Sequence, residues 1–266
     1  MEDVHARWRV EAAGSGGTPA LLLPGGLGRA ESLRPALAHL ARTRRTLAVS
    51  YPVGLLEPEA VADSLEALLA TEGGGPAHFI GVSLGAQVVR AIASRRPALF
   101  ASAVLIGAGA PDPVRGARIA RVLPLLRFMP AFLWRRRWRR ELAGLLAGHA
   151  PEVACARAAM LGLLAAMPAR EFVDGRRRLV IHDRGEGSAL GAQSSRSVPA
   201  SIPLLRLDFA DEEVVSPAER ARLTAIEPLA LLETLPSQNH GATLTWPPAL
   251  LSRLSTWLTT PASVLR

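Results

Sequence analysis

The chain has 266 residues, of which 49% are hydrophobic, and this suits one large domain or one domain with an insertion. No stretch is long and apolar enough to span a membrane, and the N-terminal segment MEDVHARWRV lacks the apolar centre of a secretory signal. The single cysteine, Cys155, excludes an internal disulfide and any CxxC motif, so we expect a cytoplasmic location.

The net charge is +8, and all 31 basic residues are arginine. Alanine, leucine and glycine are also abundant, a composition typical of a GC-rich genome. The arginine excess is therefore not evidence of a function by itself, although it favours anionic partners.

Short apolar runs alternate with helical patterns along most of the chain. The runs predict strands at 8–12, 20–23, 46–49, 78–82, 103–106, 204–207 and 229–234. Helices are expected at 32–41 with Ser32 as N-cap, at 58–70 with Pro58 at N1, at 84–96, at 218–224 and at 248–258. Strands that alternate with helices predict an α/β fold, a mostly parallel sheet flanked by helices.

The alternation stops between residues 111 and 201, where the sequence indicates only helices and loops. Insertions into such a fold commonly form lids over the active site. We therefore expect a core at 1–110 and 202–266, with a helical cap inserted at 111–201.

The most informative segment is GVSLG at 81–85, which joins a buried strand to a helical pattern. Ser83 has a glycine two residues away on each side, which is the pattern of a nucleophile elbow. The turn is so sharp that side chains at Gly81 and Gly85 would collide with the neighbouring strand and helix. The pattern therefore predicts that Ser83 is exposed at the end of the strand, beside a helix N-terminus.

A serine nucleophile needs a base and an acid that orients the base. His240 is the candidate base, because of the six histidines only it follows both the last predicted strand and the candidate acid. His5, His39 and His149 have surface contexts, whereas His78 lies at the opposite end of its strand and His182 in the inserted region.

Asp211 is the preferred acid, because it lies a short loop beyond a strand end and could turn toward the histidine. Asp208 and Asp112 remain open as alternatives. An oxyanion would be held by the backbone N–H groups of Leu84 and Gly26, the second from the glycine-rich loop PGGLG at 24–28. Metal-ligand clusters and a GxGxxG motif are lacking, so no cofactor and no metal are expected.

These features resemble the α/β-hydrolase superfamily along nearly the whole chain and, more narrowly, maspardin and its bacterial relatives. The similarity is carried by LLLPGG at 21–26, YPV at 51–53, GVSLG at 81–85, FMPAF at 128–132 and DFAD at 208–211. The resemblance implies the α/β-hydrolase fold. In maspardin the position aligned with the base histidine holds a residue that cannot serve, whereas this chain has His240. The chain also departs from common hydrolases at Pro24, where they often have histidine.

Nine arginines and no acids lie between residues 115 and 140, interleaved with Phe128, Phe132, Trp134 and Trp138. Pro124 and Pro130 are expected to break this run into short helices. We expect the four aromatic side chains to form the roof of the pocket or to face a membrane. The Arg-rich cap is also suited to an anionic membrane surface, whereas a nucleic-acid partner is not expected.

The sequence thus predicts a serine hydrolase that cleaves an ester or thioester of an apolar acyl group, with Ser83, Asp211 and His240 as a catalytic triad. The expected partner is a small-molecule acyl substrate. The alternative, implied by the resemblance to maspardin, is a catalytically inactive protein-binding module. The sequence gives no indication of the oligomeric state.

Overall fold

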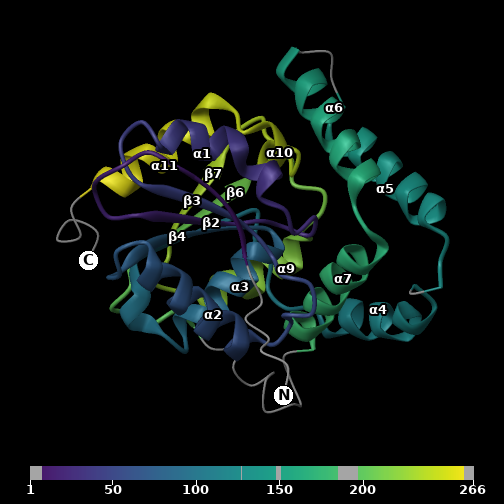
Figure 1. Cartoon of the computed structure of the whole chain (residues 1–266), viewed down its shortest axis with the longest axis horizontal. Coiled ribbons are helices and arrows are strands. Elements are labelled where there is room, and N and C mark those ends of the chain that lie inside the picture. Colours follow the sequence, from purple (N-terminus) through teal and green to yellow (C-terminus); the bar gives the residue numbers. More distant parts are fainter. Residues whose placement is uncertain (1–7, 127, 148–150, 185–196, 261–266) are drawn as a thin grey trace.

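The computed structural model describes residues 8–126, 128–147, 151–184 and 197–260. Within these ranges, seven strands form one sheet in the order β1-β3-β2-β4-β5-β6-β7 (Figure 1). Only β1 is antiparallel to its neighbour, which confirms the mostly parallel sheet. The strands are β1 (Arg9–Ala13), β2 (Ala20–Leu23), β3 (Thr46–Ser50), β4 (Ala77–Val82), β5 (Phe100–Ile106), β6 (Leu204–Phe209) and β7 (Leu231–Leu235).

The central strands are mostly apolar because the sheet is covered on both faces. All residues of β2 and β3 are buried. Successive side chains of a strand point to opposite faces, so Leu21 and Leu23 join one hydrophobic core while Ala20 and Leu22 join the other.

Helices supply the second half of each core. One core includes side chains from α2 (Pro58–Thr71), α3 (Leu84–Ala93) and α9 (Pro217–Ile226), and the other from α1 (Arg34–Leu40) and α11 (Pro248–Thr259) (Figure 1). Short helices complete the described core: the 3₁₀ turns η1 (Ala30–Leu33) and η2 (Pro97–Leu99), and α10 (Ala242–Thr245).

Ser32 does not cap a helix as expected. It lies inside η1, where its hydroxyl donates to the carbonyl of Arg29 at 2.8 Å. The following helix α1 begins at Arg34 and has proline in its first turn, a position where the missing N–H costs nothing.

Four helices occupy the described part of the segment between β5 and β6, as the sequence predicts. They are α4 (Pro113–Leu126), α5 (Ala131–Leu145), α6 (Pro151–Ala166) and α7 (Ala169–Asp183). We call them the helical insertion; in Figure 1, α5 and α6 run side by side along one edge of the molecule. Residues 185–196 of the expected cap lie outside the described residues, and the division into core and cap stays a prediction.

The helical insertion has a hydrophobic core of its own, which includes Trp134, Leu142, Met160, Leu164 and Phe172. The expected break at Pro124 is wrong, because α4 runs through this residue to Leu126. A proline removes one helical hydrogen bond, and here the helix continues for less than one turn beyond it. Pro130 does precede the start of α5.

No single described helix is long and apolar enough to cross a membrane. Among the helices that the structure describes, the pair α6 and α7, bent by 105° at their junction, has the length and composition of a broken span.

Candidate active site

Ser83 lies between β4 and α3 in a backbone conformation that L-residues rarely adopt, with φ 52° and ψ −115°. The amide of Ser83 donates to the carbonyl of Ile106 on the neighbouring strand β5 at 2.8 Å. The helix behind it is buried at every residue. Such strained conformations persist where the surroundings fix them, and here the sheet and α3 hold the serine at the carboxyl edge of β4.

Gly81 and Gly85 are required because a side chain at either position would collide with neighbouring backbone, as the sequence suggests. A Cβ on Gly85 would lie 2.4 Å from the carbonyl oxygen of Leu23, and a Cβ on Gly81 would lie 2.4 Å from the carbonyl oxygen of Gly85. Real side chains do not approach backbone atoms so closely. Any larger residue at either position would therefore push the elbow away from β2 or from its own helix.

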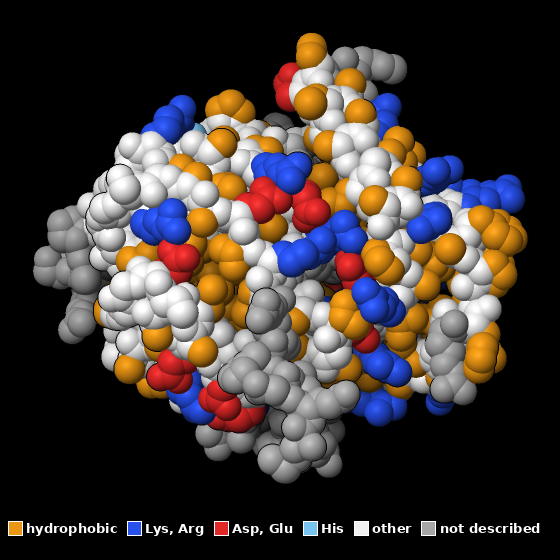
Figure 2. Space-filling view, in the orientation of Figure 1, with side chains coloured by type: hydrophobic (Ala, Val, Ile, Leu, Met, Phe, Trp, Pro, Cys, Tyr) orange, Lys and Arg blue, Asp and Glu red, His pale blue; other side chains and the backbone are white. Residues whose placement is uncertain are grey.

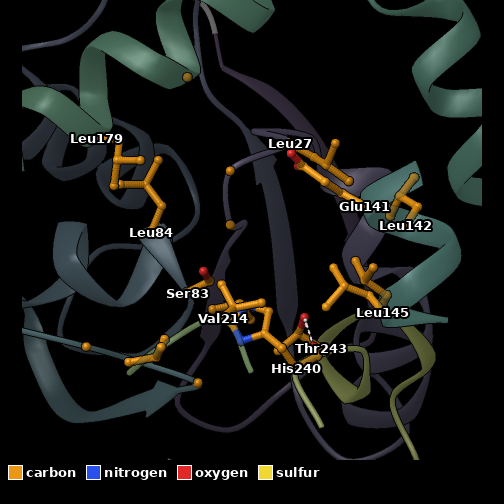
Figure 3. A pocket seen from close by; sticks show the side chains of 18 of the residues that line it. Leu27, Ser83, Leu84, Glu141, Leu142, Leu145, Leu179, Val214, His240 and Thr243 are labelled. Carbon is orange, nitrogen blue, oxygen red and sulfur yellow. Dashed lines mark hydrogen bonds between the residues drawn. The ribbon is translucent and has the colours of Figure 1, made fainter. Parts of the chain in front are cut away.

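His240 follows β7 and lies at the same edge of the sheet, beside the residue that follows β5. Its imidazole Nδ1 would be 3.3 Å from a Cβ on Gly107, a glycine with φ +57°. The amide of Ser83 is hydrogen-bonded to Ile106, and His240 lies against the next residue, Gly107. The end of β5 therefore brings the serine and the histidine together. Figure 3 shows both side chains at one pocket.

The partner of His240 is Glu212, not Asp211. Both carboxylate oxygens of Glu212 lie close to His240 Nδ1, at 2.9 and 3.0 Å, and the Glu212 side chain is only 2% exposed. Burial alone would raise the pKa of Glu212, but the hydrogen bond to His240 and the amides of Val214 and Val215 hold it below its usual value. The carboxylate is therefore ionised and acts only as an acceptor.

The structure thus places Glu212, the residue after the expected Asp211, at the imidazole of His240. The amide of Asp211 donates to the carbonyl of Gln238 at 2.9 Å, and its side chain is exposed. This bond joins the loop after β6 to the loop after β7 and leaves the next residue, Glu212, to turn inward.

The other two aspartates have different roles. Asp208 is buried against Arg206, with 2.5 Å between Arg206 Nη2 and Asp208 Oδ2. Burial raises the pKa of Asp208, and the Arg206 guanidinium only partly offsets this. Asp112 accepts hydrogen bonds from the amides of Val114 and Arg115 and so orders the start of α4.

The sequence did contain a signal for Glu212. Three carboxylates follow one another in DEE at 211–213, and glutamate serves as well as aspartate in this position of the elbow enzymes. A prediction restricted to aspartates cannot find this residue.

The remaining described histidines lie away from this edge. His78 contacts Ser102 Oγ at 2.8 Å, and burial lowers its pKa to about 4. Burial in α7 lowers the pKa of His182 to about 3. His39 contacts Ser255, while His5 and His149 lie outside the described residues.

The loop after β2 borders the serine directly. A Cβ on Gly25 would lie 3.3 Å from the Ser83 Cβ and 3.9 Å from its Oγ. The next residue, Gly26, is exposed, and Leu84 is the first residue of α3, so its amide has no carbonyl one turn earlier in the helix. These two residues lie at the cavity where an oxyanion would form.

A cavity of about 670 Å³ opens at this edge and is lined by both the core and the helical insertion. Ser83 and His240 lie on the core side. The insertion contributes residues of α4, α5 and α7 to the opposite wall. Many lining side chains are apolar; Figure 3 labels Leu27, Leu84, Leu142, Leu145, Leu179 and Val214.

The four aromatic residues of the Arg-rich segment do not act together as expected. Trp138 lines the cavity. Trp134 is 2% exposed and stacks on Phe172 with ring centroids 4.7 Å apart, so it belongs to the core of the insertion. Phe128 and Phe132 are 72% and 66% exposed. The roof of the cavity therefore contains one of the four.

In the ranges that the structure describes, no group of three or more His, Cys, Asp or Glu side chains is arranged to hold a metal ion.

The arrangement of sheet, elbow and histidine is the α/β-hydrolase fold, and solved structures share it. A hydrolase from Pseudomonas aeruginosa PA01 is similar with a TM-score of 0.76 and 19% identity, over 95% of this chain and 94% of that one. A thermophilic esterase from Thermogutta terrifontis, with malate bound, has a TM-score of 0.74 and 18% identity, over 94% and 92%.

A third similar structure is described provisionally as a non-heme bromoperoxidase, BpoC from Mycobacterium tuberculosis H37Rv. It has a TM-score of 0.70 and 19% identity, over 98% of this chain and 97% of that one. No family model matches the chain, and no curated protein matches it. At these identities the likeness establishes the fold, while the chemistry depends on the site itself.

Proposed function

We propose that the protein is a serine hydrolase that cleaves an ester or thioester of an apolar acyl group. The observation that carries the proposal is that Ser83 and His240 line one largely apolar cavity and that His240 is paired with the buried Glu212. We assign Ser83 as nucleophile, His240 as general base, and Glu212 as the acid that orients His240.

The contact between His240 and Glu212 fixes the tautomer of the imidazole. An ionised carboxylate can only accept, so His240 Nδ1 carries the hydrogen and Nε2 is left as an acceptor. As Ser83 Oγ attacks the acyl carbon, its proton passes to His240 Nε2. The Glu212 carboxylate stabilises the imidazolium that forms.

The first step forms a bond from Ser83 Oγ to the acyl carbon and places a negative charge on the former carbonyl oxygen. The amides of Leu84 and Gly26 are the proposed donors to this oxygen, aided by the N-terminus of α3. The intermediate then expels the alcohol or thiol, which takes the proton from His240. Water, activated by the same histidine, releases the acid and restores the serine.

The alternative from the resemblance to maspardin is a catalytically inactive binding module, and it stays a prediction. The buried pairing of His240 with Glu212 favours the enzyme, because a binding surface has no need of an oriented histidine beside a strained serine. The protein surface for such a partner would be the helical insertion.

Labelling with a fluorophosphonate probe tests the proposal, because this reagent reacts with activated serines. The wild type is expected to be labelled and Ser83→Ala to lose the label. Ser32→Ala is a matched control: Ser32 also lines the cavity, but its hydroxyl is bonded to the carbonyl of Arg29. That variant is expected to be labelled like the wild type.

Hydrolysis of p-nitrophenyl esters is measured on the same three proteins. Turnover that depends on Ser83 supports the enzyme. A folded wild type that takes no label and hydrolyses no short or medium acyl ester would contradict it and favour the binding module.

A further inference from the structure

Arg176 occupies an unusual place in the wall of the cavity. It lies on α7 between Gly175 and Leu179, and all three residues line the cavity. Its guanidinium carbon lies 5.1 Å from the ring centre of Trp138 and 5.3 Å from that of Phe172. Contact with aromatic rings holds the guanidinium in place, so the group is positioned before any ligand arrives.

Among the described residues, Arg176 has no carboxylate within ion-pair distance. By contrast, Arg115 in the same wall contacts Asp183 at 2.7 Å and Glu219 at 2.5 Å. Glu141 also lines the cavity, but it pairs with Arg137 at 2.9 Å. The charge of Arg176 is therefore not neutralised by the protein where it faces the cavity.

Burial lowers the pKa of Arg176, and the charge of Glu141 only partly counters this. Arginine nevertheless stays protonated in proteins. Arg176 is only partly exposed, and a cation with reduced access to water is stabilised by an anion bound beside it. Arg140 also lines the cavity but is exposed, so water solvates it already.

Arg176 lies on the side of the cavity where the loop after β2 borders the serine. A Cβ on Gly175 would lie 3.0 Å from the carbonyl oxygen of Gly26, and a Cβ on Gly26 would lie 3.8 Å from the ring of Trp138. The acids that flank His240, Glu212 and Glu213, come instead from the loop after β6. A ligand that reaches from Ser83 toward Arg176 thus moves away from the carboxylates of Glu212 and Glu213.

We propose that Arg176 binds a carboxylate carried by the substrate, so that the preferred substrates combine an apolar chain with one acidic group. This inference rests on the proposed hydrolase function and narrows its substrate class. A carboxylate matches the charge of one arginine and the planar fork of its N–H donors.

Binding of two anilides, measured by calorimetry, tests the proposal without requiring hydrolysis. The monoanilide of adipic acid carries a terminal carboxylate where hexananilide has a methyl group. The wild type is expected to bind the acidic compound roughly 10- to 100-fold more tightly, the range for a charge-assisted hydrogen bond. Arg176→Met keeps an apolar side chain against Trp138 and is expected to bind both compounds equally.

Arg177→Met is the matched control, because Arg177 is the next residue of α7, is half exposed and does not line the cavity. It is expected to retain the wild-type preference, while Arg176→Lys should keep part of it. Thermal unfolding of each variant checks that the fold is intact.

Three results would overturn the proposal: equal binding of both anilides by the wild type, an unchanged preference in Arg176→Met, or an equal loss of affinity for both compounds in that variant. The last result would mean that Arg176 only steadies Trp138.

Turnover separates this inference from the proposed function. With the p-nitrophenyl monoester of adipic acid, Arg176→Met is expected to raise KM, while KM for p-nitrophenyl hexanoate stays unchanged. If neither ester is hydrolysed and Ser83 takes no label, the hydrolase proposal fails, and the anilide binding still decides the role of Arg176.

Discussion

Arginine has different surroundings in the core sheet and in the helical insertion. In the core, Arg90 is buried with Glu227 at 2.6 Å, and Arg206 is buried with Asp208 at 2.5 Å. In α5 of the insertion, Arg136, Arg139 and Arg140 are exposed. The core thus uses these two arginines to complete its internal structure, whereas α5 presents arginine outward.

The core and the helical insertion also contribute different kinds of residue to the cavity. The core contributes Ser83 and His240 from strand ends, where the sheet fixes their positions. The insertion contributes Trp138, Arg176 and several leucines. These residues can be substituted without moving Ser83. Changes in the core are therefore expected to abolish the reaction, and changes in the insertion to alter which molecules are bound.

The largest effect is expected for Glu212→Gln, which keeps the shape of the side chain but removes its charge. The glutamine amide can donate to Nδ1 and so favour the wrong tautomer of His240, and it has no charge to stabilise the imidazolium; kcat should therefore fall roughly 10²- to 10⁴-fold. The measurement is steady-state hydrolysis of a p-nitrophenyl ester.

Asp211→Asn and Glu213→Gln are the controls for this change, since neither side chain has a hydrogen bond to the imidazole of His240 in the described structure. Both should retain kcat within about threefold. A larger loss in Asp211→Asn than in Glu212→Gln would restore the aspartate as the acid.

A smaller effect is expected for Trp138→Leu, because this side chain lines the cavity wall rather than the catalytic edge. Each methylene of a substrate is worth only about 1–3 kcal/mol in an apolar pocket. The ratio of kcat/KM for long over short acyl esters should therefore change by roughly tenfold, with kcat for the short ester nearly unchanged. Phe132→Leu, at an exposed position, should leave the ratio as it is; an unchanged ratio in Trp138→Leu would mean that the acyl chain binds elsewhere.

The smallest effect concerns the exposed surface of α4, the first turn of α5 and the described residues between them, which we propose to contact anionic membranes. Apolar side chains are exposed there at Val114, Leu125, Phe128, Phe132 and Leu133. Figure 2 shows hydrophobic and basic side chains together on the side of the molecule where Figure 1 places α4 and α5. Such a mixed surface suits the boundary of an anionic bilayer.

Vesicles that contain an anionic lipid provide the measurement for this surface. The double variant Phe128→Ser with Phe132→Ser is expected to lower sedimentation with these vesicles by about threefold or more. Leu229→Ser, which changes an exposed leucine between α9 and β7, is the matched control. Equal binding of the double variant and the wild type would exclude this surface from membrane contact.

The fold could be predicted because the parallel strands are mostly apolar runs and are separated by helical patterns. Ser83 and His240 could be predicted as well, because each follows a strand in the order that the elbow requires. Their roles in catalysis remain a proposal.

The acid could not be chosen from the sequence, since three adjacent carboxylates fit the spacing. The choice depends on a bond between two distant loops, from the amide of Asp211 to the carbonyl of Gln238. The sequence also could not show which of the four aromatic residues of the Arg-rich segment are internal, because that too depends on contacts between distant segments. Only the packing of Phe172 from α7 shows that Trp134 is internal.

The conformation of Ser83 has a consequence for the balance between stability and activity. A residue other than glycine at φ 52° and ψ −115° raises the free energy of the folded state by about 1–3 kcal/mol. The chain could be more stable with a glycine there, but it would then have no hydroxyl group at the cavity. The elbow is therefore a place where the residue that would be most stable differs from the residue that the proposed reaction needs, and the fully buried helix α3 holds the strained conformation in place.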